Sequence, residues 1–377
     1  MTSRLRSVFV LLLVVALAQA APAVAAGKQV LEREVAPGVT YRRVINPKIP
    51  RVTHTITVDP ASGYTLDVGL AKPKLPGMAT TSSMASEAGA LAAINGDFGI
   101  LPGRPAHLFA DDGELLQPSQ VGGNGRGFGF GPDGTPMHIG VTNVRMSVAA
   151  SGARVRVERW NNGPPGANGL VVFSPRGGTW ETPPEDACAA RLISASGWSV
   201  AGTGMERSFT VDAVRCGQAP MNPDGGFVLA SRQSGTGSAY IQALAPGSPV
   251  SLKWTVGWTG TQDVLGGSAV LVENGDMAAE AGCSGYLCMK HPRTGVGITA
   301  DGKVLMIQVE GRYWRSNGAT LSQFARIFIN AGASYAMNLD GGGSSTMVIE
   351  GKVVNYLSDG IQRSVSSALL VVPDPAA

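Results

Sequence analysis

The sequence has little charge and few aromatic residues: Asp, Glu, Lys and Arg make up 15% and Phe, Trp and Tyr 6% of its 377 residues. The formal net charge is only +3, which gives no basis for expecting a nucleic-acid partner. Beyond residue 26 the chain has no uninterrupted apolar run of the roughly 18 residues that a membrane-spanning helix needs. We therefore expect no stable membrane insertion.

Several motifs of common catalytic and metal sites are missing. No G-x-S-x-G occurs, which argues against a serine hydrolase with a nucleophile elbow. The histidines at 54, 107, 138 and 291 form no H-x-x-x-H pair, which disfavours a zinc site. Gly125–Gly131 lacks the spacing of a dinucleotide fingerprint, and no EF-hand loop is present, although calcium binding by Asp-rich loops stays open. We predict no metal and no cofactor.

Residues 1–26 have the pattern of a secretory signal peptide. Arg4 and Arg6 precede an apolar core from Val8 to Ala18, and small residues stand before Gly27. Cleavage there lowers the net charge by two, from +3 to +1. The alternative is an uncleaved anchor, for which the apolar core is short. We expect a protein that is secreted or held in the cell envelope.

Four cysteines in an exported chain most simply form two disulfides, which can be connected in three ways. We expect neighbours to pair, Cys188 with Cys216 and Cys283 with Cys288. Zinc is the competing interpretation, but the gap of four between Cys283 and Cys288 and the lack of a second close pair disfavour it.

Short strands and turns are expected to dominate, because the chain contains 51 Gly and 24 Pro. Residues 53–59 and 64–70 alternate in period two around a turn at 60–63, which predicts a hairpin. From Phe128 to Thr259 we expect strands broken by clusters of Gly, Pro and Asn. Further strands are predicted at 295–299, 304–309, 347–350 and 353–355.

Two helices are predicted, and each leads into a strand that ends in Asn, Asp and Gly. Residues 81–90 precede the strand 91–94, and residues 320–331 precede the strand 335–339. Thr320-Leu-Ser-Gln323 has the form of a capping box. The fold class is therefore α+β, with strand-dominated mixed sheets and a few helices, and two corners of similar sequence could face one pocket.

The most informative stretch is 336–346, where an apolar strand leads from Asp340 into three glycines and three hydroxyl residues. Gly341, Gly342 and Gly343 lack Cβ atoms, so their backbone can lie against a ligand. The neighbouring N–H groups can bind an anion or a hydroxyl-rich ligand. The alternative is an ordinary strand-to-turn transition in which Asp340 accepts its own backbone N–H groups.

Four segments together, in this order, resemble the phosphodiester glycosidase domain family, which includes the uncovering enzyme that removes N-acetylglucosamine from a sugar phosphodiester. The resemblance covers residues 85 to 372, with weaker support from 264–272 and 310–312. Departures are Asp97 and Gly99, where the family usually has Gly and Phe, and Gly295, where it usually has Ala. The segments are 93–98 (A-I-N-G-D-F, similar to A-I-N-G-G-F-F), 291–299 (H-P-R-T-G-V-G-I-T, similar to H-P-R-T-A-I-G), 338–346 (N-L-D-G-G-G-S-S-T) and 362–370 (Q-R-S-V-S-S-A-L-L, similar to E-R-x-V-x-x-A-L).

The expected organisation is the signal peptide (1–26), an N-terminal strand-rich segment (27–84), the glycosidase-like domain that the resemblance covers (85–372) and a tail (373–377). The resemblance implies a glycosidase that hydrolyses the glycosidic bond of a sugar-1-phosphodiester and releases free sugar and a phosphomonoester, and the signal-peptide pattern predicts that it is exported. The expected substrates are cell-envelope or extracellular glycans. Two alternatives stay open: an envelope glycan-binding protein without catalysis, and a phosphodiesterase that breaks the phosphorus–oxygen bond.

A phosphomonoester leaves as a stable anion, so this reaction needs a cation on the phosphate more than a strong general acid. Arg293 is our first candidate for that cation, with a structural ion pair as its alternative role. Asp340 is the first candidate to stabilise the oxocarbenium ion, as nucleophile or as base for water, or else it only binds sugar hydroxyls. Asp97 and Glu310 compete for the role of second carboxylate.

The remaining candidates are donors for sugar hydroxyls or phosphate. Turn capping is the alternative role for Asn95, Thr294 and Ser344, and a structural ion pair is the alternative for Arg312 and Arg363. The predicted substrate-binding residues are Asn95, Gly96, Arg293, Thr294, Arg312, Gly341, Gly342, Gly343, Ser344, Ser345 and Arg363.

Overall fold

The structure, a computed structural model, describes residues 27–119, 125–177, 187–194, 196–217, 225–282 and 284–375. The predicted signal peptide lies outside these residues. Strands dominate them, which confirms the expected fold class. No helix in the described ranges has the length and apolar character needed to cross a membrane. The described residues contain three α-helices: α1 (Thr81–Glu87), α2 (Thr236–Gln242) and α3 (Leu321–Asn330).

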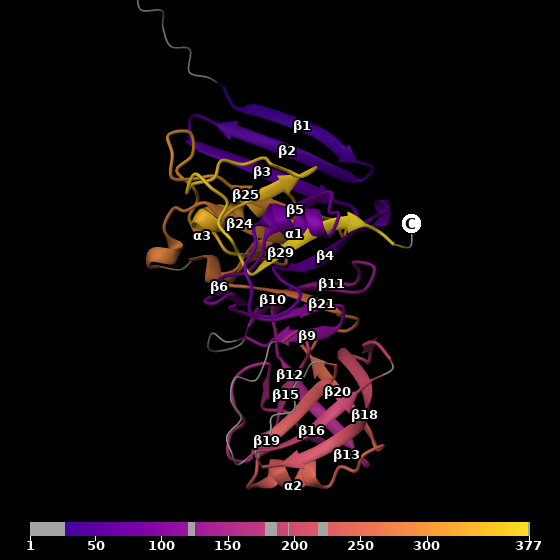
Figure 1. The fold of residues 1–377 in the computed structure, drawn as a ribbon. Coiled ribbons are helices and arrows are strands. Elements are labelled where there is room, and N and C mark those ends of the chain that lie inside the picture. Colours follow the sequence, from indigo (N-terminus) through magenta and orange to yellow (C-terminus); the bar gives the residue numbers. More distant parts are fainter. Residues whose placement is uncertain are drawn as a thin grey trace, which may run out of the picture.

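An eight-stranded antiparallel sheet forms one layer of the upper lobe in Figure 1. Val296 and Met337 on one face are buried against Ile94 of a second sheet. Helix α3 covers the other face with Phe324 and Phe328, and its predicted capping box between Thr320 and Gln323 is confirmed. The strand order is β1 (Gln29–Ala36), β2 (Val39–Asn46), β3 (Arg51–Val58), β25 (Val304–Val309), β24 (Arg293–Thr299), β26 (Ala333–Asn338), β22 (Ala269–Glu273) and β23 (Asp276–Met277).

The second layer is a five-stranded antiparallel sheet. Its outer face packs against α1, where Met84 and Ala85 are buried with Ala93 and Leu370. Successive side chains of a strand point to opposite faces, so alternate residues of each strand are buried either between the two sheets or against α1. The strand order is β28 (Lys352–Val353), β27 (Met347–Ile349), β5 (Ala92–Asn95), β29 (Ser367–Pro373) and β4 (Tyr64–Leu70).

The hairpin predicted over residues 53–70 is wrong. Both strands exist, but β3 pairs with β2 and β25 in the first layer, whereas β4 pairs with β29 in the second. A short 3-10 turn, η1 (Pro60–Ser62), carries the chain from one layer to the other. Period-two alternation shows that a strand has one buried face, but it does not identify the partner strand.

A third sheet lies between the upper lobe, which contains the two sheets described above, and the lower lobe, which is built on a fourth sheet from residues 145–255. Phe109 and Phe128 are buried in the upper core, whereas Leu108 and Val264 are buried in the lower core. A two-stranded ribbon of β6 (Gly99–Ile100) and β7 (Arg104–Pro105) precedes this sheet in the chain. The order in the third sheet is β11 (Met137–Val141), β10 (Arg126–Phe130), β21 (Asp263–Gly267), β8 (Phe109–Asp111) and β9 (Glu114–Gln117).

The lower lobe is built on a nine-stranded sheet with α2 packed against it (Figure 1). Cys188 and Cys216 lie opposite each other in β16 and β18, and their predicted disulfide is confirmed. Cys283 lies outside the described residues, so the second bridge stays a prediction. The strand order is β13 (Ala153–Arg156), β12 (Arg145–Ala150), β20 (Pro249–Thr255), β18 (Gly204–Cys216), β16 (Ala187–Ile193), β19 (Phe227–Arg232), β15 (Val171–Phe173) and β14 (Arg159–Trp160), with β17 (Ser199–Val200) paired to β18.

Candidate active site

The two polar corners of similar sequence meet in the upper lobe. The Nδ2 atom of Asn95, at the end of β5, donates to the backbone oxygen of Asp340 at 2.9 Å. The backbone N–H of Asp340 donates to the carbonyl oxygen of Gly96 at 3.1 Å. The Oδ1 atom of Asn95 accepts from the Thr294 hydroxyl at 2.8 Å and from the Thr346 N–H at 3.0 Å. Because Asn95 is fully buried, its amide acts as a brace that joins the corners.

Asp340 is a carboxyl whose pKa is raised by its surroundings. Burial raises the pKa of Asp340 to about 6, and the charge of Asp97 acts in the same direction. The Ser344 hydroxyl, the Gly341 N–H at 2.8 Å and the charge of Arg363 lower this pKa without cancelling the effect of burial. Such a carboxyl is mostly ionised at neutral pH and can still exchange a proton. Asp340 therefore has the properties of a nucleophile or a general base.

The triple-glycine turn lets two arginines approach its backbone closely. A Cβ atom at Gly342 would lie 3.0 Å from the guanidinium of Arg312, and one at Gly343 would lie 2.3 Å from that of Arg363. Both arginines pair with Asp359, yet 38% of the Arg312 side chain and 51% of the Arg363 side chain stay exposed. Two guanidinium groups that solvent can reach are suited to bind a phosphate.

Arg293 lies beside this turn in a different environment. Its Nε atom donates to the carbonyl oxygen of Ala319 at 3.0 Å and its Nη2 atom to that of Met289 at 2.7 Å. The residue is only 4% exposed, and burial lowers the pKa of its guanidinium to about 10. Arg293 thus joins two backbone segments, while Arg312 and Arg363 are the more accessible cations.

Asp97 forms a buried pair with His107. Its Oδ1 atom lies 2.7 Å from Nδ1 of His107 and accepts the Phe98 N–H at 2.7 Å, while Oδ2 accepts the His107 N–H at 2.6 Å. Asp97 is fully buried, whereas 15% of the His107 side chain is exposed. A carboxylate at Nδ1 favours the tautomer with its proton on that nitrogen, which leaves Nε2 as the acceptor. Asp97 therefore orients an imidazole at the same corner as Asp340.

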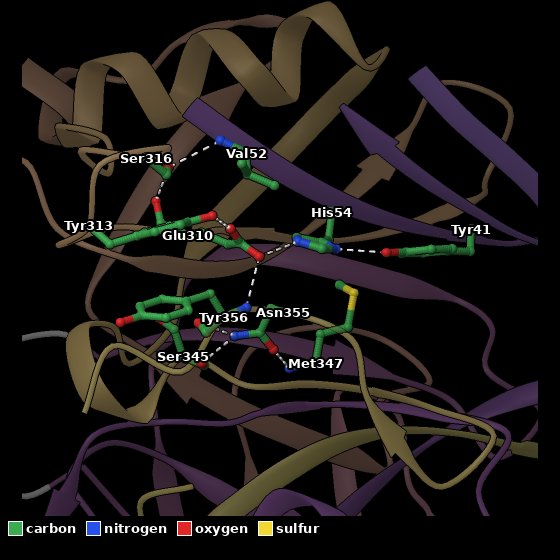
Figure 2. Close-up of polar contacts among 10 residues, drawn as sticks. All are labelled: Tyr41, Val52, His54, Glu310, Tyr313, Ser316, Ser345, Met347, Asn355 and Tyr356. Carbon is green, nitrogen blue, oxygen red and sulfur yellow. Dashed lines mark hydrogen bonds and ion pairs between the residues drawn. The ribbon is translucent and has the colours of Figure 1, made fainter. Parts of the chain in front are cut away.

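Glu310 anchors the neighbouring loops, as Figure 2 shows. Its Oε1 atom accepts from Nε2 of His54 and from the Tyr356 N–H, both at 2.8 Å, and its Oε2 atom accepts from the Tyr313 hydroxyl. Nδ1 of His54 lies 2.7 Å from the Tyr41 hydroxyl. Burial alone would raise the pKa of Glu310, but these bonds and the charge of His54 lower it. The carboxylate is thus held ionised by groups of the protein itself.

A second buried amide shapes the chain after the glycine turn. Asn355 accepts the N–H of Met347 at 2.7 Å and donates to the carbonyl oxygen of Ser345 at 3.0 Å (Figure 2). Ser345 is itself buried. These contacts fix the path of the turn that carries Asp340.

Most of the predicted site residues therefore lie together. The sequence did not predict two residues that contact them, His107 and Asp359. His107 belongs to no site motif in the sequence, and Asp359 lies outside the family motifs. Among the described residues, no three His, Cys, Asp or Glu side chains are grouped so that they could hold a metal ion. The residues joined by the contacts above are Asn95, Gly96, Asp97, Thr294, Arg312, Asp340, Gly341, Gly342, Gly343, Ser344 and Arg363.

Residues 207–372 match the family model described as phosphodiester glycosidase, which confirms the resemblance for the motifs at 291–299, 338–346 and 362–370; the motif at 93–98 lies outside this match. The SPbeta prophage-derived protein YomE of Bacillus subtilis is 44% identical over 85 residues, 22% of this chain and 13% of YomE. Bovine N-acetylglucosamine-1-phosphodiester α-N-acetylglucosaminidase is 36% identical over 73 residues, 19% of this chain and 14% of the bovine protein. The matches thus span only about a seventh of these relatives.

Two crystal structures share the fold. A protein from Synechocystis superposes with a TM-score of 0.66 at 21% identity, covering 89% of this chain and 62% of the other. A protein from Burkholderia pseudomallei, named as an exported protein, superposes with a TM-score of 0.65 at 17% identity, covering 92% and 97%. The arrangement of sheets is therefore shared across nearly the whole length of this chain.

Proposed function

We propose that this chain is an exported phosphodiester glycosidase that hydrolyses the glycosidic bond of a sugar-1-phosphodiester. One observation carries the proposal. The glycine turn that follows Asp340, whose pKa is about 6, lies against the accessible guanidinium groups of Arg312 and Arg363. All three residues lie within the segment that matches the family model. The corner thus combines a carboxylate for the anomeric carbon with cations for the phosphate.

In the proposed reaction, the bond between the anomeric carbon and the phosphate oxygen breaks, and a water oxygen bonds to that carbon. The electron pair of the broken bond leaves with the phosphate, whose charge Arg312 and Arg363 stabilise. Asp340 either takes the proton from water or first forms a covalent glycosyl intermediate that water then hydrolyses. The leaving phosphomonoester is a stable anion, so a strong general acid is not required.

The other predicted site residues receive separate roles. Asp97 acts through His107, whose Nε2 takes the proton of the attacking water in the route where Asp340 has formed the glycosyl intermediate. The N–H groups of Gly341 and Gly342 donate to Asp340 and to the carbonyl oxygen of Pro292, so Gly343 and Ser344 are the members of the turn that we assign to substrate oxygens. Asn95, Thr294, Arg293 and Glu310 position the corner and its neighbouring loops, because their polar atoms are bonded within the protein.

Export is part of the proposal. The signal-peptide pattern, the Cys188–Cys216 disulfide and the likeness to a protein named as exported support it, because disulfides persist mainly outside the cytosol. Substrates would then be envelope or extracellular glycans with sugar-1-phosphate linkages. Secretion can be checked directly by locating the protein in cell fractions and sequencing its N-terminus.

The direct test is to incubate the purified protein with uridine diphosphate N-acetylglucosamine and with synthetic α-hexose-1-phosphodiesters, and to measure free sugar. We expect release with at least one substrate and its loss in Asp340→Asn. Asp301→Asn is the matched control, since Asp301 is an exposed carboxylate in the β24–β25 turn, paired with Lys303. Unchanged turnover in Asp340→Asn would refute the role of Asp340.

A binding protein without catalysis is the second candidate, and the contacts of Asp97 and Glu310 favour it. Both carboxylates are fully engaged by protein donors, so neither is free to serve as a second catalytic carboxylate. This alternative predicts that sugar phosphodiesters bind the site and that no free sugar forms even at high protein concentration. Calorimetric titration followed by product analysis separates the two candidates.

A further inference from the structure

The lower lobe carries a positively charged groove that the proposed active site does not use. The groove encloses about 650 Å³ where β12, β13 and β20 lie side by side. Among the residues that the structure describes, four cationic side chains line it, and no acidic or aromatic residue does. The residues that matter here are Arg145, Ser147, Arg154, Arg156, Lys253 and Thr255.

Strand register places these cations on one face of the sheet. Ser147 lies opposite Arg156 on one side and opposite Lys253 on the other. Directly opposed residues of antiparallel strands point to the same face, as do residues two apart along one strand. Arg145 and Arg154 therefore share the face of Arg156 and Lys253. The alternate residues, such as Leu252 and Trp254, are buried in the lower core.

The charge on this face is largely uncompensated. Arg154 pairs with Glu206, at 2.7 Å, and Lys253 donates to the carbonyl oxygen of Ala201 at 2.8 Å. The side chains of Arg145 and Arg156 make no hydrogen bond or ion pair to any of the described residues. Like charges on neighbouring strands repel each other, so a bound anion would relieve this repulsion.

The spacing of the cations fits a chain of anions better than a single one. Residues two apart on one strand are separated by roughly 7 Å, and residues on strands two apart in the sheet by roughly 10 Å. Arg154 and Arg156 are two residues apart on β13, whereas Arg156 on β13 and Lys253 on β20 are separated by the strand β12. The Ser147 hydroxyl lies between the cations, where it accepts from Arg154 at 3.1 Å and keeps its own proton to donate to a ligand oxygen; the Thr255 hydroxyl is bonded to Thr203 and Gly257.

We propose that this groove binds a polymer of phosphodiester-linked polyol or sugar units. The proposal rests on the proposed function, since such a polymer would be held here while a sugar-1-phosphodiester on it reacts at Asp340. A single-stranded nucleic acid fits less well, because its binding relies on stacking of bases on aromatic side chains, and no aromatic residue in the described part of the chain lines the groove.

The test measures binding of a fluorescently labelled glycerol-phosphate oligomer by anisotropy at several salt concentrations. We expect Arg145→Gln with Arg156→Gln to weaken binding about tenfold or more and to flatten its salt dependence, because two fewer cations contact phosphate. Turnover of a small sugar phosphodiester should not change. The matched control, Arg326→Gln with Lys352→Gln, removes two exposed cations from the upper lobe and should bind like the wild type.

Three results would overturn the proposal. These are equal binding by both double variants, absence of binding by the wild type, and equal affinity of the wild type for an oligodeoxythymidine of the same charge. Failure of the proposed function is separate from these outcomes. In that case the small phosphodiester is not hydrolysed, while the oligomer still binds through Arg145 and Arg156.

Discussion

The side-chain amide of Asn95 donates to the backbone oxygen of Asp340 at 2.9 Å and so joins two corners that lie 245 residues apart in the chain. The same amide accepts from Thr294 and Thr346. A buried side chain with this many partners is costly to remove, because each partner loses its hydrogen bond in a place that water does not reach. The position of Asp340 thus depends on a residue from another strand.

We expect Asn95→Ala to lower the free energy of unfolding by about 2–3 kcal/mol, because several buried polar groups lose their partner. Denaturant unfolding followed by circular dichroism measures this change. Asn317→Ala is the control, since Asn317 is exposed, and it should change stability by less than about 0.5 kcal/mol. If Asn95→Ala lowers the free energy of unfolding no more than the control does, the hydrogen bonds of Asn95 contribute little to stability.

The raised pKa of Asp340 predicts how activity depends on pH. The carboxylate is the active form, so kcat should rise with pH and reach half its plateau near pH 6. Arg363→Gln removes a positive charge that lowers this pKa, so the acidic limb should move to higher pH. Arg326→Gln, which removes an exposed cation of α3, should leave the profile unchanged, and a profile without an acidic limb would contradict the assignment.

The same pKa predicts a change in stability of known sign. A folded-state pKa of about 6 lies above the ordinary carboxyl value of roughly 4, so the folded state binds the proton more tightly. The free energy of unfolding should therefore decrease as pH rises from about 4 to about 6. Asp340→Asn should reduce this dependence, which urea unfolding at several pH values can measure. An equal slope in both proteins would argue against the raised pKa.

Arg312 and Arg363 lie against the glycine turn, so replacing them should lower catalytic efficiency only for substrates whose leaving group is a phosphate. Arg363→Gln and Arg312→Gln should each lower kcat/KM for a sugar phosphodiester about 10- to 100-fold, because each removes a charge-assisted contact to phosphate. An aryl glycoside of the same sugar has no phosphate, so any turnover of it should stay unchanged. Equal losses on both substrates would indicate damage to the fold.

The Asp97–His107 pair predicts non-additive effects. Asp97→Gly restores the residue usual in the family, and His107→Gln removes the imidazole that Asp97 orients. If the two side chains act as one unit, the double variant should be no slower than the worse single variant. Values of kcat/KM for the four proteins complete the cycle. Losses that multiply would show that Asp97 and His107 act independently.

Local features of the sequence predicted much of the fold. The capping box at Thr320 marked the start of α3, and the Asp301-Gly302 turn separates the confirmed strands β24 and β25. Strand pairing across the two layers was not predictable, because alternation carries no information about the partner. Helix α2 was missed, since it has only seven residues and its N-terminal cap residue, Gly235, makes no side-chain capping bond.

The sequence predicted which residues come together, whereas the roles assigned to them stay predictions. The motifs around Asn95 and Asp340 identified two corners that do meet. The sequence could not show that Arg293 is buried against backbone carbonyls or that His54 engages Glu310, 256 residues away. Such contacts depend on tertiary packing, which decides whether a charged residue binds a ligand or the protein itself.

The central claim is that the glycosidic bond breaks at the anomeric carbon, and hydrolysis in water enriched with heavy oxygen tests it most directly. Mass spectrometry of the two products locates the label after a single turnover of a sugar-1-phosphodiester, before free sugar exchanges with solvent. We predict the heavy oxygen in the released sugar and none in the phosphomonoester. Label in the phosphate would show cleavage of the phosphorus–oxygen bond and would contradict the account.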